Sequence, residues 1–404
     1  MISTDFAPNE DWYDALISLS LLFQPWKWQR GKHSEIIKKL LSQIFKNFHA
    51  YLFLSGRSAL FTILCSLQLP AGSEVIVQAF TCEAVILPIL KNHLQPIYAD
   101  IESSTFSMNP IDLEKKITDK TKVVILQHTY GLTPIQRSQI QLIVRKHKLV
   151  LIEDIAHGYS IQEIKNQSAS WRTKIKDSIF LMSFGRSKAL SSVFGSAILT
   201  NNKIISDKLE RFKTKSYPSY WFVFRLLLYK PLAMIIKSTY DSGFGKLLHK
   251  IINMTKILVP EISSIEKNGT FDMLLDKAYP NALAILLHRQ LTKFEQIRKL
   301  RASICDIYSK NLKNQSLKIK NSSLIRYPIL VNQPQKMLDK ASKQNIFLGK
   351  WYDQVVAPKS VSLEKVKYKN GSCKVAENLC QHIISLPTTI SKKDAYKIIN
   401  VIQQ

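Results

Sequence analysis

Short apolar runs alternate with amphipathic stretches over the first half of the chain. The runs are continuous, which is typical of strands buried on both faces of a mostly parallel sheet. Strands are predicted at residues 74–78, 122–127, 149–154, 178–182 and 196–200. Helical stretches are predicted between them at residues 58–67, 83–91, 110–116 and 135–147. This order predicts an α/β fold with helices on both faces of the sheet.

The flanking regions have a different pattern. The first fifty residues are irregular and then helical, with an amphipathic helix expected at residues 34–48. A long helix is predicted at residues 281–311, followed by short elements at 324–330, 337–344, 375–382 and 392–402. We therefore expect an N-terminal segment (1–50), a large domain (51–215), an apolar and basic helical insertion (216–265), and a long helix with a smaller α+β domain (266–404).

Composition narrows the classes of protein. Hydrophobic residues make up 46% of the 404 positions and charged residues 22%, which excludes a wholly disordered chain. The 57 lysines and arginines exceed the 30 acids by 27, so a strongly basic face is expected. Such a face suits nucleic acid, an anionic membrane or a phosphorylated small molecule. No zinc-finger or RNA-binding signature is present, so a nucleic-acid partner is not expected.

Cysteine usage and hydropathy bear on location. The five cysteines are scattered, without a CxxC pair or zinc-type spacing, so free thiols in a reducing cytoplasm and no metal site are expected. The first residues have no basic region or cleavage site, so no signal peptide is expected. The longest apolar stretch, 220–236, is interrupted by Arg225, Lys230 and Pro231 and is shorter than a spanning helix of about 20 residues.

Three short segments carry candidate chemistry. Asp154 ends a predicted strand, and Ser183 to Lys188 follow the next one, so both belong at the ligand-binding edge of the sheet. The Ser55–Ser58 segment opens a helix, where free N–H groups and the helix dipole favour an anion. A lysine for a Schiff base, a carboxylate for a pyridine nitrogen and an anion cradle together match pyridoxal phosphate.

Eight short motifs occur in a fixed order along the chain, and together they indicate a specific protein family. They are Ser55-Gly56-Arg57-Ser58-Ala59-Leu60, residues 72–81, residues 96–101, His128-Thr129-Tyr130-Gly131, residues 152–157, Ser183-Phe184-Gly185-Arg186-Ser187-Lys188, residues 373–377 and residues 385–387. With these motifs the chain resembles the DegT/DnrJ/StrS family of sugar aminotransferases, across roughly residues 50–210 and 275–400. The resemblance implies a fold-type-I pyridoxal-phosphate transferase, with a mostly parallel seven-stranded sheet and a smaller C-terminal domain.

The resemblance also implies a role for individual residues. Lys188 would attach the cofactor and move a proton between cofactor and substrate carbons, and Asp154 would hold the pyridine nitrogen. His157 would lie near the ring hydroxyl. Ser183, Gly56 and the backbone of Arg57 and Ser58 would hold the phosphate. His128 and Tyr130 are expected to line the substrate side of the site.

Several positions depart from the family pattern. Cys82 stands where many members have an aromatic side chain that stacks on the cofactor ring. Arg57 replaces a threonine beside the phosphate, where it either adds a charged contact or points to solvent. An asparagine that members contribute across the dimer aligns with Asp276, whose charge would repel phosphate. Asn281 is a nearby substitute, or simply a helix-start residue.

The expected function is transfer of an amino group from an amino acid, in this family usually glutamate, to a keto sugar attached to a nucleotide, for amino-sugar or surface-polysaccharide synthesis. A homodimer is expected. One alternative is a sugar dehydratase, although those relatives replace the attachment lysine with histidine. Another is a regulatory or membrane-associated binding protein. Residues 217–260, with aromatic and cationic side chains, suit either a membrane-surface helix or an insertion that packs against protein.

Overall fold

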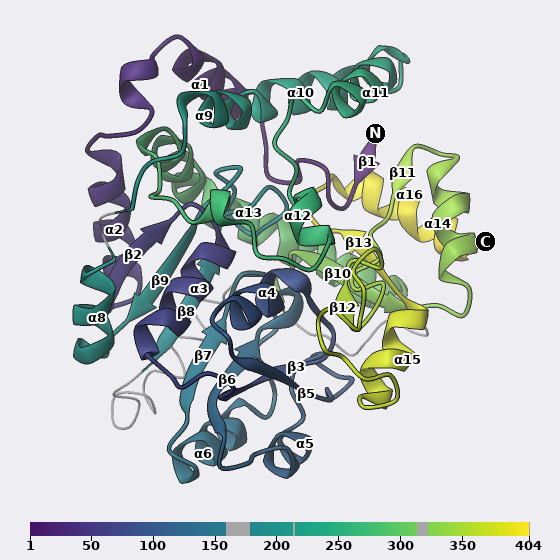
Figure 1. Ribbon diagram of the computed structural model, residues 1–404. Helices are drawn as coiled ribbons and strands as arrows, with labels where there is room; N and C mark the ends of the chain where they lie inside the picture. The colour runs from purple at the N-terminus through teal and green to yellow at the C-terminus, as the bar shows by residue number, and fades with distance from the viewer. Residues whose placement is uncertain (159–177, 213–214, 313–321, 404) are drawn as a thin grey trace.

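A seven-stranded sheet forms the centre of the computed structural model, which describes residues 1–158, 178–212, 215–312 and 322–403 (Figure 1). Its order is β2-β9-β8-β7-β6-β3-β5. The strands are β2 (His49–Phe53), β3 (Glu74–Gln78), β5 (Gln95–Ala99), β6 (Thr121–Gln127), β7 (Val150–Asp154), β8 (Ile179–Ser183) and β9 (Ser196–Thr200). β9 runs antiparallel to both neighbours, and the other pairings are parallel. The predicted fold class is confirmed.

Helices cover both faces of this sheet. Along β6, Val123 and Ile125 pack into one hydrophobic cluster, whereas Val124 and Leu126 pack into another. Successive side chains of a strand point to opposite faces, so the continuous apolar run serves two cores. The helices are α3 (Gly56–Leu67), α4 (Glu83–Lys91), α5 (Pro110–Lys115), α6 (Arg137–Lys146) and α8 (Lys203–Glu210), with a 3-10 turn, η2 (Thr129–Gly131).

β5 is a strand that the hydrophobic pattern did not predict. It lies at one edge of the sheet and pairs only with β3. Its buried and half-buried positions alternate, and it contains Pro96, which lacks the N–H that a second neighbour would require. An edge position explains both the weak pattern and the tolerated proline.

The C-terminal part forms a smaller layered unit. The long helix α13 (Asn281–Asn311) has the predicted bounds. It is followed by β10 (Arg326–Leu330), α14 (Pro334–Ser342), β11 (Ile346–Phe347), β12 (Val356–Ala357), α15 (Lys374–His382), β13 (Ile383–Pro387) and α16 (Lys392–Gln403). β10 and β13 pair antiparallel, while β12 pairs with β4 (Thr81–Cys82) of the large domain. This last pairing brings residues 350–358 beside Cys82.

The N-terminal segment contains two helices and a short strand. These are β1 (Ile2–Ser3), which pairs with β11, then α1 (Trp12–Leu22), η1 (Pro25–Lys27) and α2 (His33–Ile44). The structure corrects the expectation of an irregular start. In α1, Trp12 and Leu16 are exposed while Asp14 is buried, which reverses the usual pattern of a helix in water.

The insertion between β9 and α13 folds into short helices. They are α9 (Tyr220–Leu227), α10 (Tyr229–Thr239), α11 (Phe244–Thr255), α12 (Ser264–Lys267) and η3 (Met273–Leu275). α9 and α10 contact α1, where the Ser18 hydroxyl donates to the Leu227 carbonyl at 2.7 Å. None of the helices in the described parts of the chain has the length and apolarity that crossing a bilayer requires.

A buried ion pair joins the N-terminal segment to the insertion. Lys230 of α10 pairs with Glu10, and both side chains are fully buried. We expect Glu10→Gln to lower the free energy of unfolding by about 3–5 kcal/mol, because it leaves the lysine charge buried without its partner. Urea denaturation measures this change.

The matched control is Glu35→Gln, which breaks the Lys38–Glu35 pair at the surface. A change within about 0.5 kcal/mol is expected there. Equal effects of the two substitutions would contradict a special role for the buried pair.

Candidate active site

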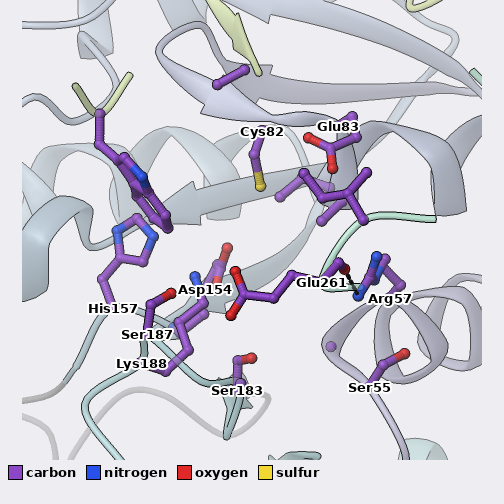
Figure 2. A pocket seen from close by; sticks show the side chains of 18 of the residues that line it. Ser55, Arg57, Cys82, Glu83, Asp154, His157, Ser183, Ser187, Lys188 and Glu261 are labelled. Carbon is purple, nitrogen blue, oxygen red and sulfur yellow. Dashed lines mark hydrogen bonds between the residues drawn. The ribbon is translucent and has the colours of Figure 1, made fainter. Parts of the chain in front are cut away.

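One cavity of about 330 Å³ collects most of the predicted site residues (Figure 2). Asp154 is the last residue of β7 and Ser183 the last of β8, and these parallel strands end at the same edge of the sheet. The start of α3 and residues 350–358 complete the walls. The predicted residues that line this cavity are Gly56, Arg57, Cys82, Asp154, His157, Ser183 and Lys188.

Asp154 is buried and held in a fixed orientation. One carboxylate oxygen accepts a hydrogen bond from the Gln127 side chain at 3.0 Å, and the other accepts from the Ala156 N–H at 2.9 Å. Burial raises the pKa of Asp154, while these hydrogen bonds and the Lys188 charge act in the opposite direction. A positioned carboxylate of this kind suits a protonated ring nitrogen.

Lys188 is the buried amine of the cavity. Its backbone carbonyl accepts from Asn9 at 2.6 Å, so the N-terminal segment supports the turn that presents it. Burial lowers the pKa of Lys188, with the Cys82 and Asp154 side chains acting in the opposite direction. A lowered pKa increases the neutral fraction of the amine, which is the form that attacks a carbonyl carbon.

The start of α3 leaves room for an anion. The Ser55 hydroxyl caps the helix by accepting from the Ser58 N–H at 3.1 Å, whereas the N–H groups of the first helical residues have no partner within a helix. A side chain at Gly56 would place its Cβ 3.7 Å from the Ser183 hydroxyl. Glycine therefore keeps this space open, and the donors here fit the phosphate of pyridoxal phosphate.

Arg57 lines the cavity, but its guanidinium is engaged elsewhere. One of its terminal nitrogens donates to both carboxylate oxygens of Glu266 at 2.6 Å, and the other donates to the Glu261 backbone carbonyl at 2.9 Å. The predicted alternatives were a phosphate contact or a solvent-facing side chain. In the structure this arginine ties the start of α3 to the insertion.

Ser58, Asp276 and Asn281 are not part of the cavity lining. The Ser58 hydroxyl donates to Asp276 at 2.8 Å, and Asp276 also pairs with Lys215, which compensates its charge. The Asn281 side chain accepts from the His33 N–H at 3.0 Å and donates to the Lys27 carbonyl at 2.7 Å. Within one chain, Asn281 thus joins α13 to the N-terminal segment. Whether Asp276 or Asn281 meets a partner's cofactor stays a prediction.

His157 connects the cavity to residues behind it. Its Nδ1 accepts from the Tyr130 N–H at 3.2 Å, and its Nε2 lies 3.2 Å from the Tyr352 hydroxyl. Burial lowers the pKa of His157 well below its ordinary value, so the ring is neutral. Tyr130 itself is buried outside the cavity.

His128 also lies behind the cavity wall. Its ring nitrogen is 2.9 Å from Glu153, which Arg137 pairs as well. Burial acts to raise the pKa of Glu153, but Arg137 and His128 lower it to about 2. His128 therefore supports the turn after β6 and does not face a ligand in this chain.

Several residues of the cavity could not be predicted from the sequence. Trp351 and Tyr352 stack with ring centroids 5.5 Å apart, and Trp351 lies 5.6 Å from His157. The sequence around Trp351 and Tyr352 does not mark them as site residues, because only the pairing of β12 with β4 brings them to the site. Trp351 and Tyr352 thus bring aromatic rings to the cavity, where Cys82 has no ring to offer. Burial raises the pKa of the Cys82 thiol to about 12, which keeps it neutral.

Two acidic side chains were also missed. Glu83 is almost fully buried beside Cys82, and one of its carboxylate oxygens has no hydrogen-bond partner among the described residues. Figure 2 shows the Glu261 side chain directed towards the middle of the cavity. Glu83 could have been noticed in the sequence, because it is the one charged residue in the apolar segment 83–90. No local signal marked Glu261, which arrives from the insertion.

The fold and this set of residues define a transferase of the pyridoxal-phosphate type. The chain belongs to the DegT/DnrJ/EryC1/StrS aminotransferase family, whose model matches residues 19–222 and 279–403. The predicted family and enzyme class are confirmed. The family model leaves residues 223–278, which contain most of the insertion, unmatched.

Curated relatives are sugar-modifying enzymes. GDP-perosamine synthase of Vibrio cholerae is 29% identical over 260 residues, which cover 61% of this chain and 68% of that protein. The 3-oxo-glucose-6-phosphate:glutamate aminotransferase of Bacillus subtilis (strain 168) is 30% identical over 156 residues, or 39% of this chain and 35% of that protein.

Solved structures share the fold over nearly the whole chain. PseC of Helicobacter pylori, an aminotransferase of pseudoaminic acid biosynthesis, has a TM-score of 0.71 at 18% identity, covering 99% of this chain and 98% of that one. NtdA of Bacillus subtilis, solved with bound PMP, has a TM-score of 0.70 at 20% identity, covering 97% and 82%. The cofactor prediction agrees with these neighbours.

Glu83 generates a prediction about stability and pH. Burial raises its pKa from the usual 4.5 to about 7, so above pH 7 the folded protein must hold a buried charge. This penalty is absent below pH 4.5 and complete above pH 7. We expect Glu83→Gln to stabilise the cofactor-free protein at pH 8 by on the order of 3 kcal/mol, and to have little effect at pH 4.5.

Urea denaturation at both pH values measures the difference. Glu364→Gln, at an exposed position, is the control and should show no such pH dependence. Loss of stability at pH 8 in the Glu83 variant would show that the carboxylate has a partner in the folded protein.

Proposed function

We propose that this family member transfers an amino group from an amino acid, first of all glutamate, to a keto sugar. The proposal depends on one observation: Lys188, Asp154 and the open start of α3 line the same cavity. These groups supply an amine, a carboxylate and an anion cradle. The relatives named above act in sugar and amino-sugar chemistry, which supports the acceptor class.

The residues of this chain divide the work. Pyridoxal phosphate, when bound, supplies an electron-withdrawing ring that stabilises negative charge on the carbon next to the substrate nitrogen. Asp154 keeps a proton on the ring nitrogen, and Ser183 with the start of α3 binds the phosphate. The Lys188 amine would take the proton from the substrate carbon next to the nitrogen and deliver it to the cofactor carbon that retains the amino group. Trp351 and Tyr352 cover the site and exclude water.

The alternatives have less support. A dehydratase of this family would carry histidine at the lysine position, and Lys188 is present. A binding protein without catalysis was suggested by Cys82 and Asp276. Aromatic cover from Trp351 and compensation of Asp276 by Lys215 weaken both reasons. We therefore retain the aminotransferase as the proposal.

The visible absorbance spectrum tests the attachment lysine. The protein with pyridoxal phosphate should show a visible band that Lys188→Ala abolishes, and glutamate should bleach the wild-type band. Lys350→Ala is a matched control, because this lysine lines the same cavity and should leave the band intact. A band that survives Lys188→Ala, or ignores every amino donor, would contradict the proposal.

A second cavity lies next to the first and is a candidate binding site for part of the acceptor sugar nucleotide. Its volume is about 940 Å³, and Glu261 and Ile262 line both cavities, so the two share a wall. Besides the acidic Asp5 and Glu261, its lining includes cationic and aromatic side chains: Arg186, Arg225, Lys256, Lys267, Phe6, Tyr229, Tyr240 and Phe347. Cations suit phosphates and aromatic rings suit a base. We propose this cavity for the nucleoside diphosphate of the acceptor.

The acceptor's KM tests this placement. Lys256→Ala with Lys267→Ala should raise KM for a nucleotide-linked keto sugar about tenfold, because two phosphate-attracting charges are lost. Bleaching by glutamate should stay unchanged. Lys343→Ala, at an exposed position on the surface, is the control. An unchanged KM would place the nucleotide elsewhere.

The remaining expectations are also proposals. A homodimer is supported by the resemblance, in which each site draws on two chains. A cytoplasmic location is supported by the five cysteines, which are all free in the structure. Contact of residues 217–260 with a membrane is supported by α11, because most of its apolar side chains are exposed, and by the exposed Tyr220 and Trp221 of α9. It is not supported by α10, which packs largely inward.

A further inference from the structure

Large apolar side chains are exposed on a group of helices that contact one another, and we call this set of side chains the outer face. Figure 1 shows α1, α9, α10 and α11 in a row at the top of the view. The outer face consists of the exposed large side chains on α1, η1, α9 and α11 and the loop residue Phe23: Trp12, Tyr13, Leu16, Leu19, Phe23, Trp26, Tyr220, Trp221, Phe244, Leu247, Ile251 and Met254. Single exposed apolar residues are ordinary, but a group of this size marks an interaction surface.

α11 presents a regular apolar stripe. Phe244, Leu247, Ile251 and Met254 are spaced three, four and three residues apart, so they share one side of the helix. Their exposed fractions run from 46% to 72%. Gly245 fixes the opposite side, since a Cβ there would stand 2.4 Å from the Ile236 carbonyl of α10. Close packing on α10 therefore holds the stripe outward.

α1 is held in the same manner by polar contacts. Its inward Asp14 pairs with Lys293 of α13, and Lys293 also reaches Asp11 at 2.9 Å. With the acidic side chains turned inward, the outward positions of the helix are Trp12, Tyr13, Leu16 and Leu19. The exposure of these side chains is thus a consequence of strong internal contacts and not of fraying.

The charge around the outer face is positive. Lys246, Lys250 and Lys256 accompany the stripe, and α11 contains no acidic residue. Lys27, Arg30 and Lys32 follow α1, whose acidic positions are paired as described. Asp241, before α11, pairs with the N-terminal amine at 3.1 Å. An occupant with negative charge is therefore favoured.

We infer that the outer face docks on an anionic lipid bilayer. Tryptophan and tyrosine prefer the headgroup level, apolar side chains enter the acyl boundary, and lysines gain from anionic headgroups. A second copy of the chain fits less well, because a two-fold interface brings the same lysines together without acidic partners on α11. α11 also lies outside the residues that the family model matches, so its part of the outer face is an addition to the shared scaffold.

Vesicle co-sedimentation tests the inference with the full-length protein. The wild type should sediment with vesicles of phosphatidylglycerol and phosphatidylcholine at low salt, and much less with phosphatidylcholine alone or at high salt. Leu247→Ser with Ile251→Ser should reduce the bound fraction at least about tenfold, because apolar insertion is lost. Lys246→Glu with Lys250→Glu should do the same by reversing charge.

Matched controls, which we call the far-side controls, use exposed residues on α5 and α6, at the opposite end of the molecule from α1 and α11 in Figure 1. Leu142→Ser on α6 and Lys115→Glu on α5 should bind vesicles like the wild type. The visible cofactor band should be unchanged in every variant, which separates docking from the proposed chemistry and from misfolding.

Three results would overturn the inference. The wild type could remain in the supernatant with anionic vesicles, or the far-side controls could lose as much binding as the α11 variants. Alternatively, light scattering could show that the α11 variants convert a dimer to a monomer while vesicle binding is absent. The last result would assign the outer face to a second copy of this chain.

Discussion

Two opposite charges buried in one cavity are the constraint on which the site depends. Asp154 and Lys188 both lose hydration, which raises the pKa of the acid and lowers that of the amine. Hydrogen bonds partly offset the loss of hydration: Gln127 and Ala156 donate to the Asp154 carboxylate, and Asn9 donates to the Lys188 backbone carbonyl. A charged cofactor can then be bound where water is largely excluded.

The insertion contributes charged side chains to the cavity and to its contacts with the rest of the chain. Its Glu266 neutralises Arg57, its Glu261 enters the cavity, and Lys230 pairs with Glu10 of the N-terminal segment. The Arg57–Glu266 and Lys230–Glu10 pairs, which are buried or nearly so, therefore fasten the insertion to the rest of the chain. Its apolar side chains divide between an inner set, mainly on α9 and α10, and an outer set on α11 and at Tyr220 and Trp221 of α9. This division explains why one amphipathic segment can both complete a site and offer an outer surface.

The departures from the family pattern are compensated within the structure. Cys82 lacks a stacking face, but Trp351 and Tyr352 bring rings to the same cavity. Asp276 would repel phosphate, but Lys215 pairs with it. Neither compensation was readable from the sequence, because each depends on residues brought together by strand pairing or by the insertion.

The sequence by itself determined the five inner strands of the seven-stranded sheet, the long helix and the attachment motifs, but neither edge strand, β2 or β5. Buried strands need continuous apolar runs, and the predicted strands differ from the observed ones by at most a residue or two. α13 has the predicted ends. Asp154, Ser183 and Lys188 were predictable because parallel strands end at one edge. Only the tertiary structure decided the edge strand β5, the outward-facing α1, the roles of Ser58, His128 and Asn281, and the arrival of Trp351 and Glu261. These depend on contacts between residues far apart in the chain, for which a local pattern of polar and apolar positions carries no information.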